Sequence, residues 1–230
     1  MAELKLLNNS IFWIPKESKD IHYQYIKREI FEILIYDYHL CPMPRRGGVV
    51  LDVGANIGMF AKYAAVYKNN KVISFEPSKI CLEPLRKNLE SCLDKVILIY
   101  KGTWSHTGKL GFKESEEFSG CNRIVSLPEE SDYAIDVVTI DDTIEDIQSV
   151  SDLKYNSVDF IKMDVEGAEM ESLIGAENTI KKYKPNMAIS VYHKPTDEKE
   201  IIDYVKSLVD YKITVINHVN IGIKVAYFYN

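Results

Sequence analysis

From Val49 onward, the chain alternates between short apolar runs and longer stretches with helical periodicity. The apolar runs have the length of buried strands, and they lie at 49–53, 71–76, 95–100, 158–163 and 186–192. The stretches between them carry apolar residues at helical spacing and predict helices at 57–68, 78–92, 168–183 and 196–209. Alternating strands and helices are typical of a parallel sheet with helices on both faces, so we expect an α/β fold.

The last part of the chain follows a different pattern. Two strand-like runs, 211–218 and 223–230, are separated by only a few residues around "VNIG". That connection is too short for a crossover helix, so the two strands must pair antiparallel. A further run, "IDVVTI" at 135–140, alternates like an added strand. The pattern predicts a mostly parallel sheet that ends in an antiparallel C-terminal hairpin strand.

Two segments lie outside this series. A stretch rich in tyrosine and isoleucine at 20–40 has the length of a helix, and "CPMPRRGG" ends it. We therefore divide the chain into an N-terminal helical cap or extension, 1–48, and a main domain, 49–230, which together form one structural unit. The predicted helix either packs on the sheet edge or covers the substrate, in which case its tyrosines would line a pocket: Tyr23, Tyr25, Tyr36 or Tyr38. The polar insertion at 101–136, which includes "SGCNRIV", either folds over the substrate or forms an edge hairpin.

Composition limits the class of protein. A chain of 230 residues with 46% hydrophobic content is long enough for one well-buried domain. A net charge of -6 argues against nucleic acid as a partner, because that interaction depends on many cations. The four cysteines lack zinc-site spacing, no apolar run approaches the roughly 18 residues of a membrane span, and "MAELKLLNNS" is no signal peptide. We expect a soluble cytoplasmic protein with reduced thiols, and the tyrosine-rich helix offers a surface for a homodimer.

The loop between the first predicted strand and helix, "DVGANIG", has the position of a ligand-binding loop. Ligands bind there because helix amides converge at the carboxyl edge of a parallel sheet. A dinucleotide site needs G-x-G-x-x-G, but Asn56 occupies the place of the second glycine between Gly54 and Gly58. A side chain there obstructs a pyrophosphate and leaves room for S-adenosylmethionine, which has no phosphate. We expect Gly54, Ala55, Asn56 and Gly58 to contact that cofactor.

Several further residues are candidates for cofactor binding. Glu76 ends the second strand, where a carboxylate can accept both ribose hydroxyls. Asp52 ends the first strand and either orients the loop amides or approaches the ammonium group of the cofactor. Trp104 and Ser105 follow the third strand, so Trp104 either stacks on adenine or packs in the core.

The motifs together resemble those of a known family. "LDVGANIG", "FEPS", "VVTIDD" and above all "VDFIKMDVEGAEMESLIGA" are similar to the FkbM-type methyltransferases, a branch of the class I S-adenosylmethionine-dependent methyltransferases. The resemblance extends from about Val49 to Lys194. It implies a Rossmann-like, seven-stranded sheet with a reversed last strand, and methylation of a hydroxyl, often on a sugar or a secondary metabolite.

The "KMDVEGAE" block follows the fourth strand of the parallel series and faces the same sheet edge. Asp164, Glu166 and Glu169 gather negative charge where the cofactor carries a sulfonium cation, and Asp164 is therefore also a cofactor-binding candidate. A hydroxyl needs a base to become a good nucleophile, and the candidates are His193, Glu166 and Asp164. His193 ends the fifth strand, and its unperturbed pKa near 6.5 suits proton transfer. We assign no metal, although Asp164 and Glu166 could supply ligands to a divalent cation that activates the hydroxyl.

These residues predict an S-adenosylmethionine-dependent O-methyltransferase that modifies a hydroxyl of a sugar, a glycan precursor or a secondary metabolite. One alternative is N-methylation of an amide or amine on a small metabolite, because the same cofactor site permits it. A second alternative is an NAD-linked oxidoreductase, which Asn56 and the terminal hairpin disfavour.

Overall fold

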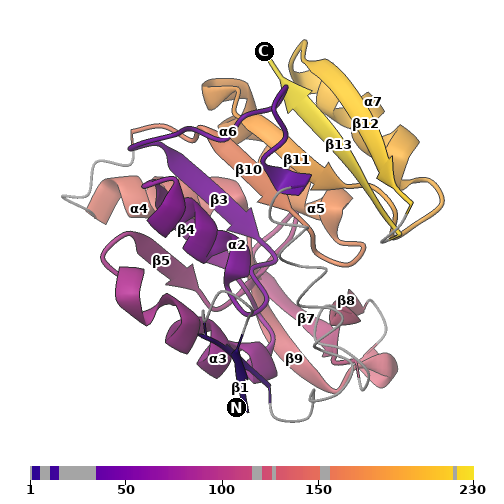
Figure 1. The fold of residues 1–230 in the computed structure, drawn as a ribbon. Helices are drawn as coiled ribbons and strands as arrows, with labels where there is room; N and C mark the ends of the chain where they lie inside the picture. Colours follow the sequence, from indigo (N-terminus) through magenta and orange to yellow (C-terminus); the bar gives the residue numbers. More distant parts are fainter. Residues whose placement is uncertain are drawn as a thin grey trace.

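The computed structural model describes residues 2–5, 11–15, 35–115, 121–125, 128–150, 156–219 and 222–230. Its centre is a seven-stranded sheet with the order β12-β13-β11-β10-β3-β4-β5 (Figure 1). The strands are β3 (Val49–Val53), β4 (Lys71–Phe75), β5 (Val96–Ile99), β10 (Phe160–Met163), β11 (Asn186–Ser190), β12 (Lys212–His218) and β13 (Ile223–Tyr229).

Strand direction in this sheet matches the expected pattern. β5, β4, β3, β10 and β11 pair parallel to their neighbours, whereas β13 pairs antiparallel to both β11 and β12. The last strand is therefore the reversed one, inserted between β11 and β12. The prediction of a mostly parallel sheet with a reversed C-terminal hairpin strand is confirmed.

Helices cover both faces of the sheet, because side chains of successive strand residues point to opposite faces. Val50 of β3 and Phe160 of β10 pack on one face with residues of α2 (Met59–Lys62) and α3 (Lys79–Leu89). Leu51 and Ile161 pack on the other face, with four further helices. Those helices are α4 (Ile140–Val150), α5 (Glu169–Ile174), α6 (Glu177–Tyr183) and α7 (Asp197–Leu208).

The insertion forms a second sheet of four strands with the order β6-β9-β7-β8. Its strands are β6 (Gly102–Thr103), β7 (Gly108–Lys113), β8 (Arg123–Val125) and β9 (Tyr133–Val138). β7 and β8 pair antiparallel, so an edge hairpin is present. The predicted strand "IDVVTI" is β9, but it belongs to this sheet and its last residue, Ile140, begins α4.

Three elements differ from the expectation. α4 follows β9 in a stretch to which the sequence pattern assigned no element. The helix expected over 168–183 is two helices, α5 and α6, separated at Gly175 and Ala176. The 57–68 helix is α2, continued as a π-helical turn over Tyr63–Tyr67.

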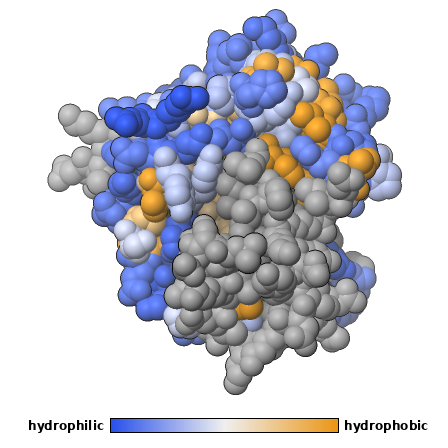
Figure 2. All heavy atoms as spheres, viewed as in Figure 1, coloured by the Kyte–Doolittle hydropathy of each residue, from blue (hydrophilic) through white to orange (hydrophobic). Residues whose placement is uncertain are grey.

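The N-terminal segment contains a two-stranded antiparallel pair, β1 (Ala2–Lys5) and β2 (Ile11–Ile14), which the pattern did not predict. Most of the helix expected over 20–40, including Tyr23 and Tyr25, lies outside the described residues. On the face shown in Figure 2, the described atoms are mostly hydrophilic. Among the described residues, none of the helices has both the length and the apolar character that a membrane crossing requires.

Candidate active site

The glycine loop lies against the backbone that follows β10. Gly54 has a positive φ of 84°, and a Cβ built on it would lie 1.8 Å from the carbonyl oxygen of Asp164. Only glycine fits such a close approach together with this φ. The two quoted motifs, "LDVGANIG" and "MDVEGAE", therefore meet at the carboxyl edge of the sheet.

Glu76 lies beside the same loop, as its position after β4 predicted. Its carboxylate accepts hydrogen bonds from the backbone amides of Asn56, at 2.7 Å, and Ser78, at 2.8 Å. Burial raises the pKa of Glu76 to about 7, against the lowering effect of these two amides. A carboxylate has about four lone-pair positions, so two accepted amides leave capacity for a further donor.

Asp52 lies inside the sheet, where it faces Lys162. The two residues are register partners on β3 and β10, and both are on the α2/α3 face because of strand alternation. Asp52 is fully buried, and its Oδ1 lies 3.2 Å from Lys162 Nζ. Burial raises the pKa of Asp52, although Lys162 opposes that rise. The structure does not bring Asp52 to the open edge, and its contact with Lys162 connects it to the loop.

Lys162 connects this buried pair to the glycine loop. Its ammonium donates a hydrogen bond to the carbonyl oxygen of Gly54 at 2.5 Å and lies over the ring of Tyr36. The sequence pattern did not indicate a role for Lys162, although it and Asp52 are the only charged residues in the strands "FIKM" and "VVLDV". A charged residue inside an otherwise apolar strand is the feature from which a role for Lys162 could have been predicted.

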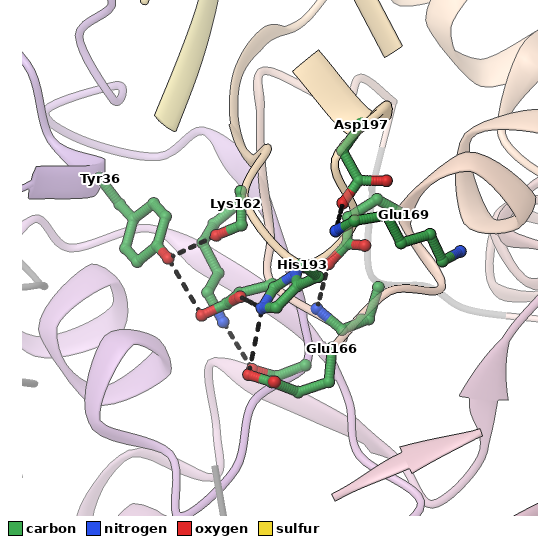
Figure 3. Close-up of polar contacts among 11 residues, drawn as sticks. Tyr36, Lys162, Glu166, Glu169, His193 and Asp197 are labelled. Carbon is green, nitrogen blue, oxygen red and sulfur yellow. Dashed lines mark hydrogen bonds and ion pairs between the residues drawn. The ribbon is translucent and has the colours of Figure 1, made fainter. Parts of the chain in front are cut away.

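Tyr36 connects the segment before β3 to the acidic block (Figure 3). Its hydroxyl donates to Asp164 Oδ2 at 3.1 Å and shares a hydrogen bond with Ser190 Oγ at 3.0 Å. Tyr36 is one of the tyrosines that would line a pocket if the segment covers the substrate, and it is buried. Tyr38 instead packs against Tyr227, with ring centroids 4.7 Å apart and the rings tilted by 35°.

Three carboxylates surround the imidazole of His193. The Nε2 atom lies 3.5 Å from Asp164 Oδ1 and 3.3 Å from Glu166 Oε1, and Nδ1 lies 2.9 Å from Glu169 Oε1. Figure 3 shows His193 at the centre of this group. Asp164 and Glu166 follow β10, Glu169 begins α5, and His193 follows β11, so adjacent parallel strands bring them together. The predicted catalytic residues thus form one cluster, and their catalytic role stays a prediction.

The cluster changes the protonation of His193. Burial disfavours the imidazolium, but the carboxylates of Glu166, Glu169 and Asp164 outweigh burial and raise the pKa of His193 to about 11. Burial is also the main cause that raises the pKa of Glu166, and Asp164 adds to it. An imidazole with the ordinary pKa of about 6.5, expected from the sequence, is therefore wrong for this environment.

A tight turn places Glu166. Glu166 has a φ of 53° and Gly167 a φ of 95°, two successive residues in the left-handed region. The carbonyl oxygen of Gly167 accepts a hydrogen bond from Lys194 Nζ, and the backbone amide of Lys194 donates to Asp197 at 2.6 Å. Lys194 Nζ thus holds the turn that carries Glu166, and Asp197 holds the backbone of Lys194. Non-glycine residues with positive φ concentrate at functional sites.

Trp104 and Ser105 come directly after β6. Trp104 packs against the buried residues Phe112, Ile135 and Val137 of the second sheet. Ser105 Oγ lies 3.4 Å from His106 Nδ1. The contacts of Trp104 are packing contacts, and its stacking on adenine stays a prediction.

This architecture defines a class of protein. A mostly parallel seven-stranded sheet with a reversed last strand, and a glycine loop after β3 that meets an acidic block after β10, is that of a class I methyltransferase. The model of the Methyltransferase FkbM domain matches residues 52–212, and the chain belongs to the FkbM methyltransferase family. The resemblance stated from the motifs is confirmed, and the NAD-linked alternative is set aside.

Three known proteins show how far the similarity extends. The chain is 28% identical over 186 residues to methyltransferase sdnD of Sordaria araneosa, covering 68% of this chain and 70% of that protein. It is 28% identical over 153 residues to hexuronic acid methyltransferase AglP of Haloferax volcanii, covering 66% and 59%. The crystal structure of methyltransferase FkbM from Methylobacillus flagellatus KT aligns with a TM-score of 0.60 at 29% identity, covering 80% and 44%. This chain therefore spans less than half of that solved chain.

Proposed function

We propose that the protein transfers a methyl group from S-adenosylmethionine to a hydroxyl oxygen of a carbohydrate. The observation that carries this proposal is the contact between the glycine loop and the acidic block, made by Gly54 against the Asp164 carbonyl. This contact supports the proposal because it brings the glycine loop and the backbone after β10 together at one edge of the sheet. The name of AglP, a hexuronic acid methyltransferase, supports a sugar derivative as the acceptor.

The residues at this edge fit S-adenosylmethionine. Glu76 lies beside the loop amides with acceptor capacity left for ribose hydroxyls. The carboxylates of Asp164 and Glu166 are 18% and 25% exposed at this edge, so the edge presents negative oxygens to a cationic ligand. When bound, S-adenosylmethionine supplies an electrophilic methyl group on a positively charged sulfur.

Methyl transfer to an alcohol requires that a proton leave the acceptor. The oxygen lone pair forms the new O–C bond, the C–S bond breaks with its electron pair staying on sulfur, and the hydroxyl proton passes to a base. Glu166 is our candidate for that base, because its side chain is 25% exposed, against 18% for Asp164 and 9% for His193. Its raised pKa also brings it closer to the operating range.

His193 and Asp164 have different tasks in this scheme. With a pKa of about 11, His193 is an imidazolium at neutral pH and orients the carboxylates instead of accepting a proton. Asp164 is held by the Tyr36 hydroxyl and faces the same side as Glu166. Holding donor and acceptor in line supplies the larger part of the acceleration.

The test uses purified protein, methyl-labelled S-adenosylmethionine and a panel of uronic acids, hexoses and small amines. We expect label on a sugar oxygen, and product analysis by mass spectrometry and NMR distinguishes oxygen from nitrogen. Glu166→Gln should lower kcat by about 100-fold or more, the usual size of a general-base contribution, while S-adenosylhomocysteine binding by calorimetry stays intact. Glu171→Gln, in the same helix region but outside the cluster, is the matched control.

Methylation of nitrogen with no labelled sugar would support the amine alternative and overturn the carbohydrate proposal. A Glu166→Gln variant with wild-type turnover would overturn the base assignment. Failure of S-adenosylmethionine and S-adenosylhomocysteine to bind at millimolar concentration would overturn the cofactor assignment.

A further inference from the structure

One potential ligand atom from each of Asp164, Glu166 and His193 lies within 4.8 Å of the other two. We propose that these residues bind a divalent cation, with Mn²⁺ or Mg²⁺ favoured. Two carboxylates and one imidazole give an oxygen-rich set with a single nitrogen, which suits Mn²⁺ and Mg²⁺ better than soft metals. His193 is an imidazolium when no cation is bound, so the cation would replace the Nε2 proton, which is released on binding. The binding itself does not depend on the proposed function.

Distances within the group agree with a shared ion. Ligand atoms that lie about 2.1 Å from one octahedral ion such as Mn²⁺ or Mg²⁺ are separated by roughly 3.0 Å, so binding would draw the two carboxylates slightly closer to His193. His193 Nε2 lies 3.5 Å from Asp164 Oδ1 and 3.3 Å from Glu166 Oε1. A strong charge-assisted hydrogen bond would instead bring these atoms to about 2.7–2.9 Å.

Two buried atoms without hydrogen bonds also support a cation between His193 and Asp164. The His193 side chain is only 9% exposed, and its Nε2 and Asp164 Oδ1 are buried with no hydrogen bond of acceptable geometry. These atoms are within ion-pairing distance, but their geometry is not that of a hydrogen bond. Buried polar atoms without a hydrogen bond need an explanation, and an ion between them supplies one.

The environment of His193 has the arrangement found around metal-binding histidines. Such a histidine usually directs its second ring nitrogen at a carboxylate, which fixes the ring and leaves the other nitrogen for the metal. Glu169 Oε1 lies 2.9 Å from Nδ1, an ion-pair contact without hydrogen-bond geometry, and the fully buried Glu169 also accepts the backbone amide of Val165 at 3.0 Å. Glu169 is therefore a positioning residue for His193 in this proposal.

A competing group of Glu169, His193 and Asp197 also has converging donors. It is less suited to an ion, because Glu169 Oε1 already accepts the Val165 amide and Asp197 Oδ2 accepts the Lys194 amide. Asp164 and Glu166 are also more exposed than Glu169, so a ligand can reach them. We assign the cation to the group that contains Asp164 and Glu166.

The consequence for catalysis rests on the proposed function. A cation held by these residues would lower the pKa of an acceptor hydroxyl lying against it. Glu166 would bind through Oε1, the oxygen that faces His193, and keep its second oxygen for the proton.

Binding is tested with Mn²⁺ alone, using the full chain after removal of metals with a chelator. Free Mn²⁺ gives an electron paramagnetic resonance signal that falls on binding, so the titration needs no activity. We expect one Mn²⁺ per chain, with affinity at least tenfold weaker in Asp164→Asn and about 10- to 100-fold weaker in Glu169→Gln. The matched control, Asp136→Asn, removes an exposed carboxylate from the second sheet and should bind as the wild type.

Absence of Mn²⁺ binding at millimolar concentration would overturn the proposal, as would unchanged affinity in Asp164→Asn and Glu166→Gln. The second variant keeps the test valid if the first does not fold, which circular dichroism checks. Calorimetry with S-adenosylhomocysteine on the chelated protein separates the two proposals. Binding of S-adenosylhomocysteine without binding of Mn²⁺ would overturn the cation proposal but not the methyltransferase proposal. Binding of Mn²⁺ without binding of S-adenosylhomocysteine would overturn the cofactor assignment but not the cation proposal.

Discussion

Lys162 holds the glycine loop through a charge that is buried inside the sheet. Its ammonium contacts both Asp52 and the Gly54 carbonyl, and its side chain is 7% exposed. Lys162→Met keeps the apolar length of the side chain and leaves the Asp52 charge unpaired. Removal of one partner from a buried ion pair costs about 3–5 kcal/mol. We expect a decrease of that size in the free energy of unfolding, measured by urea denaturation.

Lys109→Met provides the control for this loss. It breaks the pair with Asp136, in which both side chains are mostly exposed, and should leave stability unchanged. Adding Asp52→Asn to Lys162→Met should recover part of the loss, because the unpaired charge disappears. Equal stability of Lys162→Met and wild type would contradict the role given to this pair.

The raised pKa of Glu76 makes stability depend on pH. Its ordinary pKa is 4.5 and its folded value is about 7, with burial as the main cause. Between these values the folded state holds a proton that the unfolded state has lost, so this contribution is fully present below pH 4.5 and is lost as pH rises through 7. The difference in unfolding free energy between wild type and Glu76→Gln should therefore decrease across this window. Urea denaturation at several pH values checks it, and a difference that is constant with pH would contradict the assignment.

The break between α5 and α6 shows what sequence patterns miss at the level of elements. The amides of Asn178 and Thr179 at the start of α6 donate to the carboxylate of Asp141, at 2.9 and 2.8 Å. Asp141 comes from α4, far back along the chain, so no local pattern can predict that it caps α6. At the break, a Cβ on Gly175 would lie 2.1 Å from the Trp104 carbonyl oxygen. The helix ends there because of a tertiary contact.

The strands were predictable for a physical reason. β3, β4 and β10 are buried on both faces, so their residues are mostly apolar, with Asp52 and Lys162 as the buried charges among them. α4 was missed although Ile140 and Ile144 have helical spacing and are buried. The pairing of β9 with β6 and β7, which moved it to the second sheet, depends on non-local register that its own alternation does not encode.

The glycine loop joins β3 to α2. Its geometry predicts that the methyl group added by Gly54→Ala strongly lowers the free energy of unfolding. Gly54→Ala would place a Cβ against the Asp164 carbonyl oxygen at a φ of 84°, so backbone must shift. Gly47→Ala, at a φ of 71° with nothing within 4 Å, carries only the conformational cost of about 1–2 kcal/mol. We expect Gly54→Ala to lower the unfolding free energy by several kcal/mol more than Gly47→Ala and to abolish S-adenosylhomocysteine binding. Similar losses in both variants would show that the close approach does not matter.

Across the whole molecule, the candidate site was more predictable than its chemistry. Asp164, Glu166 and His193 follow adjacent parallel strands, and the carboxyl ends of such strands meet at one edge, so the sequence could bring them together. The protonation of His193 could not be predicted, because it depends on Glu169 and on burial that only the packed structure defines. Tyr36 belongs to the site because its hydroxyl donates a hydrogen bond to Asp164, and no local pattern indicates a contact between residues 128 positions apart.

The overall charge predicts which acceptors the protein excludes. The chain carries 34 acidic and 28 basic side chains, and the candidate site gathers carboxylates where a polynucleotide would present phosphates. Non-specific binding of nucleic acid depends on cations that neutralise phosphates, so this surface should bind RNA no more tightly than about 100 μM at 0.15 M salt. Fluorescence anisotropy with a labelled single-stranded RNA measures this directly. Submicromolar RNA binding that is retained at that salt would contradict a small carbohydrate acceptor and point to a polynucleotide substrate.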